Sequence, residues 1–116
     1  MLFIGIKYAF LFNLFIINKL GGIMSVLNDQ EIKEKLTNLK DWTLEGQEIK
    51  KEYELKDFSG ALKFVNKVGS FAEEMDHHPN IFMHSWNKVK ISISTHSEGG
   101  VTKKDFQLAE KIEGIK

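Results

Sequence analysis

The sequence predicts an α+β fold: a two-layer sandwich in which a four-stranded antiparallel sheet carries three helices on one face. Two observations lead to this class. Two segments show the alternation of apolar and polar residues that is typical of hairpin strands, and three others show apolar residues at helical spacing. These segments follow one another in the order α-β-β-α-β-β-α. Two hairpins separated by a helix favour antiparallel pairing, with the helices packed against the apolar side of the sheet.

The first predicted helix and the first hairpin lie within residues 28–55. Asn28 and Asp29 are both suitable N-cap residues, and apolar residues follow at helical spacing as far as Leu39. Gly46 marks the turn of the hairpin. In its second strand largely apolar positions alternate with charged ones, which predicts one buried and one exposed face.

The second predicted helix begins after Asp57, a suitable N-cap, and ends before Pro79, because the residue before a proline is driven toward extended conformations. Phe64 and Phe71 widen its apolar stripe beyond what one sheet face needs. Two explanations stay open: a deep core, or an interface between subunits. The other apolar positions of this helix are Phe58, Ala61, Leu62, Val65, Val68, Ala72 and Met75.

The second hairpin is predicted within residues 80–96, with apolar and polar side chains alternating from Val89 onward. A turn near residues 86–88 separates its strands. Thr102, with Asp105 three residues later, resembles a capping box. We therefore expect the last helix to begin there, with Leu108, Ala109, Ile112 and Ile115 as its apolar positions.

The segment 1–23 differs from the rest of the chain, because it is strongly apolar and contains no acid. As a membrane helix it is interrupted by Lys7 and Asn13. A signal peptide would place its charge before the apolar stretch and end in a cleavage site, and neither is clear. The third interpretation is an upstream start, with the working protein beginning at Met24. We expect an apolar N-terminal extension at 1–23 and one folded domain at 24–116.

The composition narrows the class of function. A chain of 116 residues with 42% apolar and 28% charged residues is typical of one soluble globular domain. Its 16 basic residues are all lysine and balance 16 acids, and no basic stripe stands out, so direct nucleic-acid binding is not expected. The absence of cysteine excludes disulfides, thiolate zinc sites and cysteine nucleophiles.

All four histidines fall within one window of twenty residues. Antiparallel pairing in the second hairpin sets His96 opposite the residues around His77 and His78. We expect these three histidines to converge at one end of the sheet, with Glu73 and Asp76 close behind them. His96 also belongs to the polar side of its strand, so a small ligand could reach this rim.

Imidazole suits proton transfer near neutral pH, because both of its protonation states are populated there. Two other interpretations stay open. A metal site could use His96, Asp76 and one further imidazole, although adjacent histidines in extended chain point apart. The histidines could also be surface residues without a role, which is the favoured interpretation for His84.

These residues resemble the signature of the pterin-4a-carbinolamine dehydratase family. The resemblance covers about residues 28–115, and the ordered agreement of so many short segments makes it specific. The first 23 residues have no counterpart in it. The segments that carry it are "DWTL" at 41–44, "DFSGALKFV" at 57–65, "WNKV" at 86–89, "STH" at 94–96 and "GGVTKKDFQLA" at 99–109, together with Glu73, His77-His78-Pro79, Trp86, His96 and Asp105.

The resemblance implies an α+β sandwich and a hydro-lyase activity. The family dehydrates 4a-hydroxytetrahydropterin to the quinonoid dihydropterin, in the recycling of the pterin cofactor of aromatic amino-acid hydroxylases. It implies no metal and no organic cofactor. It also implies a homodimer or homotetramer in the cytoplasm and, for residues 24–116, no membrane association.

The resemblance also implies roles for individual residues. His77, His78 and His96 would carry the acid–base catalysis. For two residues a structural role stays open beside the role in the site: Glu73 could instead pair with a lysine, and Trp42 could instead belong to the core. Asp105 fits helix capping better than catalysis. The residues expected to bind the substrate are Trp42, Glu73, Asp76, Ser94 and Thr95.

A second class of function stays open beside catalysis. Members of the family can act as protein-binding modules, either as a dimerisation cofactor or as a transcriptional coactivator, through their helical surfaces. That role would use Phe64, Phe71 and the wide apolar stripe rather than the histidines. A scaffold has no need of a complete histidine set, and the sequence therefore favours the enzyme.

Overall fold

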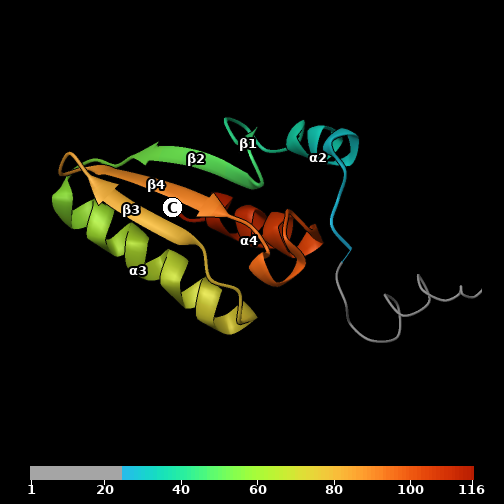
Figure 1. Cartoon of the computed structure of the whole chain (residues 1–116). Coiled ribbons are helices and arrows are strands. Elements are labelled where there is room, and N and C mark those ends of the chain that lie inside the picture. Colours follow the sequence, from blue (N-terminus) through green and yellow to red (C-terminus); the bar gives the residue numbers. More distant parts are fainter. Residues whose placement is uncertain (1–24) are drawn as a thin grey trace, which may run out of the picture.

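The computed structural model describes residues 25–116, and the predicted N-terminal extension lies outside the described residues. It has the predicted order of three α-helices and four strands, with one additional 3-10 helix (Figure 1). No helix within 25–116 combines the length and the apolar character that a membrane span requires. The elements are α2 (Asp29–Leu36), β1 (Thr43–Glu45), β2 (Glu48–Glu54), α3 (Phe58–Met75), β3 (Asn80–His84), β4 (Lys88–Ile93), η1 (His96–Glu98) and α4 (Lys103–Glu113).

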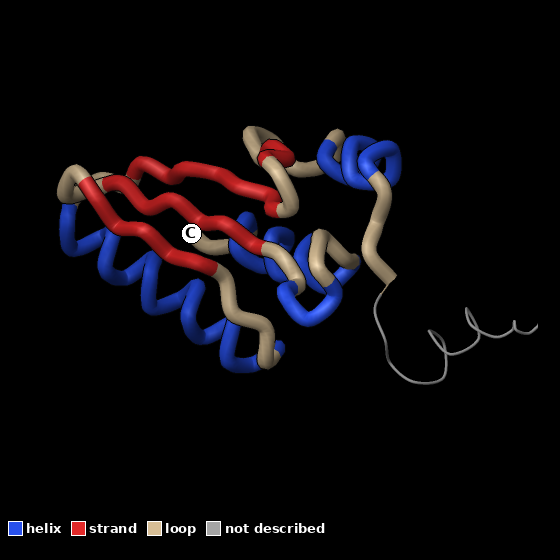
Figure 2. The backbone as a smooth tube through the Cα atoms, in the orientation of Figure 1, coloured by secondary structure: helices blue, strands red, loops and turns tan. Residues whose placement is uncertain are grey.

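The four strands form one antiparallel sheet in the order β1-β2-β4-β3. Helices α3 and α4 pack together on one side of this sheet, while α2 lies beside β1 (Figures 1 and 2). The α+β class and the element order predicted from the sequence are therefore confirmed. His84 pairs with Lys88 at the end of the β3–β4 hairpin, so its turn consists of residues 85–87.

The core lies between the sheet and the helices. Residues that pair across antiparallel strands share a face, so the pairings of Ile91 with Ile81 and of Ile49 with Ile93 gather apolar side chains on the helical side. Phe64 belongs to this core, and Phe71 packs against it. At these two phenylalanines the wide apolar stripe of α3 therefore belongs to the core of the domain.

The helix starts agree with the capping residues found in the sequence. The side chain of Asn28 caps α2 in a reciprocal capping box with Glu31. Asp57 accepts a hydrogen bond from the backbone of Gly60 at the start of α3. Thr102 forms a capping box with the third residue of α4, Asp105. These predicted caps are confirmed, because each depends on residues only three positions apart.

Candidate active site

The C-terminus of α3 turns the chain so that His77 faces the interior. Asp76 adopts the left-handed conformation with φ of 51°, and the backbone N–H of His77 then donates to the carbonyl of Ala72 at 2.9 Å. This arrangement ends the helix at Met75, four residues before Pro79. As a result His77 is only 8% exposed.

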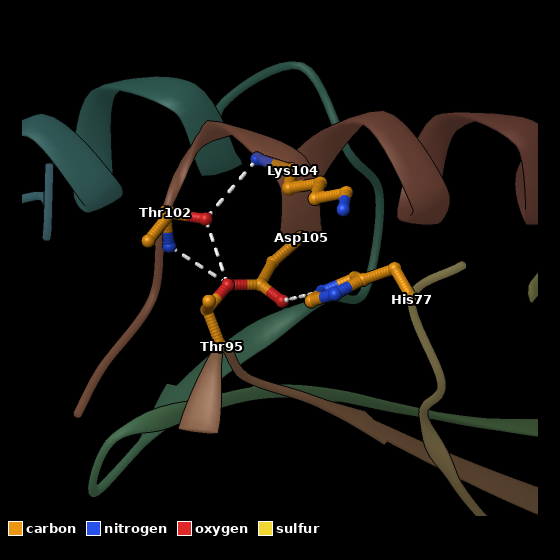
Figure 3. A network of polar contacts seen from close by, with 5 residues as sticks. All are labelled: His77, Thr95, Thr102, Lys104 and Asp105. Carbon is orange, nitrogen blue, oxygen red and sulfur yellow. Dashed lines mark hydrogen bonds and ion pairs between the residues drawn. The ribbon is translucent and has the colours of Figure 1, made fainter. Parts of the chain in front are cut away.

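Asp105 meets His77 in the interior, as Figure 3 shows. His77 Nε2 lies 2.5 Å from Asp105 Oδ1, and Asp105 is 0% exposed. The other carboxylate oxygen, Oδ2, accepts the backbone N–H of Thr102 at 2.8 Å and the hydroxyl of Thr95 at 2.9 Å. Both oxygens of this buried carboxylate therefore have partners, as a buried charge requires.

This geometry indicates which imidazole nitrogen carries the proton. Two donors converge on Oδ2, and such hydrogen bonds favour the ionised carboxylate as the acceptor. His77 Nε2 must then donate to Oδ1, and the neutral imidazole keeps its lone pair on Nδ1. A carboxylate in this position also stabilises the imidazolium that forms when Nδ1 takes up a proton.

His78 has a different environment from its neighbour. Its side chain is 56% exposed, and its Nε2 lies 2.6 Å from Oε2 of Glu73, which is exposed as well. A solvent-exposed pair of this kind contributes little to stability. His78 and Glu73 are therefore available to a ligand at the surface.

His96 lies at the start of η1 and is exposed. The β3–β4 ladder ends with the pairing of Asn80 and Ser92. Continued past that pair, the same register sets His96 level with Asp76, at the end of the sheet that the sequence predicted. Among the described residues, however, no hydrogen bond or ion pair joins two of the three histidines.

Ser94 and Thr95, expected to bind substrate through their backbone, are both buried. The backbone N–H of Thr95 donates to the carbonyl of Gly100, and its carbonyl accepts from Glu98 and Gly99. The hydroxyl of Thr95 points toward Asp105. Thr95 thus connects the loop of His96 with the buried pair of His77.

Trp42, a further expected substrate contact, lies in the hydrophobic core. Its indole Nε1 donates to Oε2 of Glu113 at 3.0 Å. The same oxygen accepts hydrogen bonds from Lys51 Nζ at 2.7 Å and from the hydroxyl of Tyr53. Glu113 therefore ties the end of α4 to β2 and to the segment before β1.

These contacts predict a pH-dependent contribution to stability. Burial opposes the charge of Glu113, but the hydrogen bonds from Lys51, Tyr53 and Trp42 outweigh it and lower its pKa below the ordinary value of 4.5. A carboxyl whose pKa is lowered by folding stabilises the protein above the unfolded value, and this is lost as the pH falls through the folded pKa. We expect Glu113→Gln to lower Tm most above about pH 5 and least near about pH 3.

Thermal unfolding of the two proteins across this pH range measures the difference. Glu110→Gln is the matched control, because Glu110 lies on the exposed side of the same helix. Its Tm should follow that of the wild type at every pH. A Glu113→Gln penalty that stays constant between these two pH values would contradict the assignment.

Two hollows of the surface lie away from the histidines. One, of about 180 Å³, lies on the open face of the sheet, and its Lys50 and Lys51 already form ion pairs with Glu45 and Glu113. The other, of about 340 Å³, is lined by residues of α3 from Lys63 to Ser70. Within residues 25–116, no group of three or more metal-binding side chains is arranged to hold an ion.

The contact between His77 and Asp105 is the feature that sequence reasoning did not assign. Asp105 was expected to cap α4, and it does so, but the same carboxylate also holds His77. The T-x-x-D spacing is a local signal and carries no information about a partner 28 residues away. Only the resemblance, which placed both residues in one signature, could have suggested it.

Comparisons with known proteins bear on the same segments. Residues 25–115 match the sequence model of a family described as "Pterin 4 alpha carbinolamine dehydratase". A protein of Sulfolobus acidocaldarius named for this dehydratase is 45% identical over 89 residues, which is 77% of this chain and 97% of that protein. A protein of Roseiflexus castenholzii with the same name is 47% identical over 91 residues, covering 78% and 97% of the two chains.

Solved structures agree with the fold. The crystal structure of a transcriptional coactivator/pterin dehydratase from Brucella melitensis has a TM-score of 0.72 and 36% identity, covering 77% of this chain and 96% of that one. A pterin dehydratase-like RuBisCO assembly factor of the alpha-carboxysome has a TM-score of 0.51 and 16% identity, over 62% and 82% of the two chains. The latter likeness concerns the fold alone.

Proposed function

Because the chain belongs to the pterin 4 alpha carbinolamine dehydratase family, we propose that it dehydrates a 4a-hydroxytetrahydropterin to the quinonoid dihydropterin and water. In this reaction the C4a hydroxyl leaves as water and the N5 proton is removed, so no net proton is consumed. The proposed setting is the recycling of a tetrahydropterin cofactor. The observation that carries the proposal is the buried contact between His77 Nε2 and the Asp105 carboxylate, at the end of the sheet where His78 and His96 are exposed.

His77 is the proposed base. Its Nε2 is engaged in the hydrogen bond to Asp105, so a proton from N5 of the substrate would be taken up at Nδ1. The carboxylate would stabilise the resulting imidazolium and return it to the neutral tautomer when the proton leaves. Burial strengthens the attraction between the imidazolium and the carboxylate, because charges interact more strongly where water is excluded.

His78 and His96 are the proposed proton donors to the departing hydroxyl. Both are exposed at the end of the sheet where His77 enters the interior. Glu73 would orient His78, whose Nε2 it already contacts. The proposed contacts to the pterin ring are Asp76 and Ser94, whereas the core position of Trp42 favours a structural role.

A dehydratase assay on the full chain tests the proposal. It follows the loss of synthetic 4a-hydroxytetrahydropterin against its spontaneous dehydration. We expect the wild type to accelerate the reaction, and His77→Ala and His96→Ala to lower kcat by about tenfold or more, as for the loss of a general acid or base.

His84→Ala is the matched control for this assay. His84 lies at the other end of β3, where its Nε2 contacts Glu52 at 2.7 Å, and it is not part of the proposed site. Its kcat should equal that of the wild type. If a folded wild type does not accelerate the dehydration at all, the pterin assignment is wrong.

One observation favours a second function as a protein-binding module. Phe58 and Leu62 of α3 are 53% and 44% exposed, on the same helix as the hollow lined by Lys63 and Lys67. The Brucella relative is described as a transcriptional coactivator as well as a dehydratase. The histidine variants separate the two functions. If a helical surface binds a partner protein, the His77→Ala variant should still bind that partner and keep the oligomeric mass of the wild type.

A further inference from the structure

We propose that Thr95 is a positioning residue of the active site, whose hydroxyl fixes the rotation of the Asp105 carboxylate and thereby holds His77 in its Nε2–H tautomer. The part of this inference that concerns turnover rests on the proposed function. The part that concerns the tautomer stands on the geometry alone.

The hydrogen bonds of this network have only one consistent direction. The backbone N–H of Lys104 donates to Thr102 Oγ1 at 3.2 Å, and Thr102 Oγ1 lies 2.8 Å from Thr95 Oγ1. Thr95 has a single hydroxyl proton and gives it to Asp105 Oδ2, which can only accept. The bond between the two threonines must therefore run from Thr102 to Thr95.

The result is a chain of donors that ends at the carboxylate (Figure 3). It begins at the N-terminus of α4, where backbone N–H groups point out of the helix and favour a negative charge. Each hydroxyl accepts one bond and donates the next, and such chains strengthen their members by polarisation. All of this converges on Oδ2, which leaves Oδ1 to His77.

Without the Thr95 hydroxyl the rotation of the Asp105 carboxylate is no longer restricted. Asp105 Oδ2 would keep only the backbone N–H of Thr102, and the hydroxyl of Thr102 would lose its acceptor. A buried polar group without a partner is costly, so the carboxylate or the Thr102 side chain would rotate to compensate. His77 would then no longer face a carboxylate oxygen held in one position.

The backbone of Thr95 extends the same control to His96. Its carbonyl accepts from Glu98 and Gly99, and its N–H donates to Gly100, so both ends of the η1 loop are attached to this residue. His96 is the next residue in the chain. Thr95 is thus the point at which the loop of one proposed catalytic histidine is joined to the carboxylate of another.

The test uses the full chain with Thr95→Val and Thr95→Ser. Valine fills the same space without a hydroxyl, whereas serine keeps the hydroxyl. Nitrogen-15 NMR of the histidine side chains reports the tautomer of His77 directly. We expect only the Nε2–H form in the wild type and in Thr95→Ser, and a mixture with the Nδ1–H form in Thr95→Val.

In the dehydratase assay, Thr95→Val should lower kcat by roughly tenfold with little change in KM, the effect expected from losing one hydrogen bond to a charged group. Thr95→Ser should restore kcat to about the wild-type value, which a purely structural role in packing would not require.

An Nδ1–H tautomer in the wild type would overturn the inference even if Thr95→Val does not fold. So would a folded Thr95→Val that keeps the wild-type tautomer. A dehydratase-inactive wild type with the expected tautomers would refute the proposed function and leave the positioning role in place.

Discussion

Asp105→Asn is expected to lower kcat of the dehydration by roughly 10²-fold or more, which is within the range that one acid–base group contributes. Asparagine has nearly the shape of aspartate but adds an amide NH₂ group. If the NH₂ faces Oδ2's position, it opposes the backbone N–H of Thr102, which cannot reverse its direction. If it faces His77, the imidazole must accept at Nε2 and move its proton to Nδ1.

The first orientation leaves a neutral amide oxygen at His77 Nε2 and so removes the charge that stabilises the imidazolium, whereas the second removes the lone pair on Nδ1. Steady-state kinetics over a range of substrate concentrations measures the effect. The variant should differ from the wild type in kcat more than in KM, because it stabilises the transition state less but leaves the exposed residues that would contact the substrate intact. The buried mismatch should also lower the free energy of unfolding by about 1–3 kcal/mol.

Asp57→Asn is the matched control for this substitution. Asp57 caps α3 through its contact with Gly60 and touches no histidine, and asparagine caps a helix about as well as aspartate. This variant should keep both its kcat and its stability. A folded Asp105→Asn protein with wild-type kcat would show that Asp105 only caps α4.

The second large effect is expected on stability. Ile91 lies at the centre of β4, is completely buried, and faces Ile81 on the neighbouring strand. Ile91→Ala removes three carbon atoms from a region where sheet and helices meet, and it should cost about 2–5 kcal/mol because the cavity closes only in part. For a domain of this size Tm should fall by roughly 10 °C or more.

Ser92→Ala is the corresponding control. Ser92 is the next residue of β4 but points to the opposite face of the sheet, where it is only partly covered. Thermal unfolding should show its Tm close to that of the wild type. Equal losses for the two variants would contradict the position of the core on the helical side.

The sequence by itself determined the elements and their order. Alternation in the two hairpins and helical spacing elsewhere report which face of each element is buried, and the caps at Asn28, Asp57 and Thr102 mark where the helices begin. These signals depend on residues a few positions apart. They are therefore readable in the chain without knowledge of what packs against it.

The tertiary structure alone decided which of these residues work together. The interpretation of Asp105 as a cap was incomplete, because its bond to His77 needs the left-handed turn at Asp76 that brings the two together. The wide stripe of α3 could mean core or interface until packing placed Phe64 inside and left Leu62 exposed. Such contacts join residues far apart in sequence, and their identity depends on the three-dimensional path of the chain between them rather than on any local pattern.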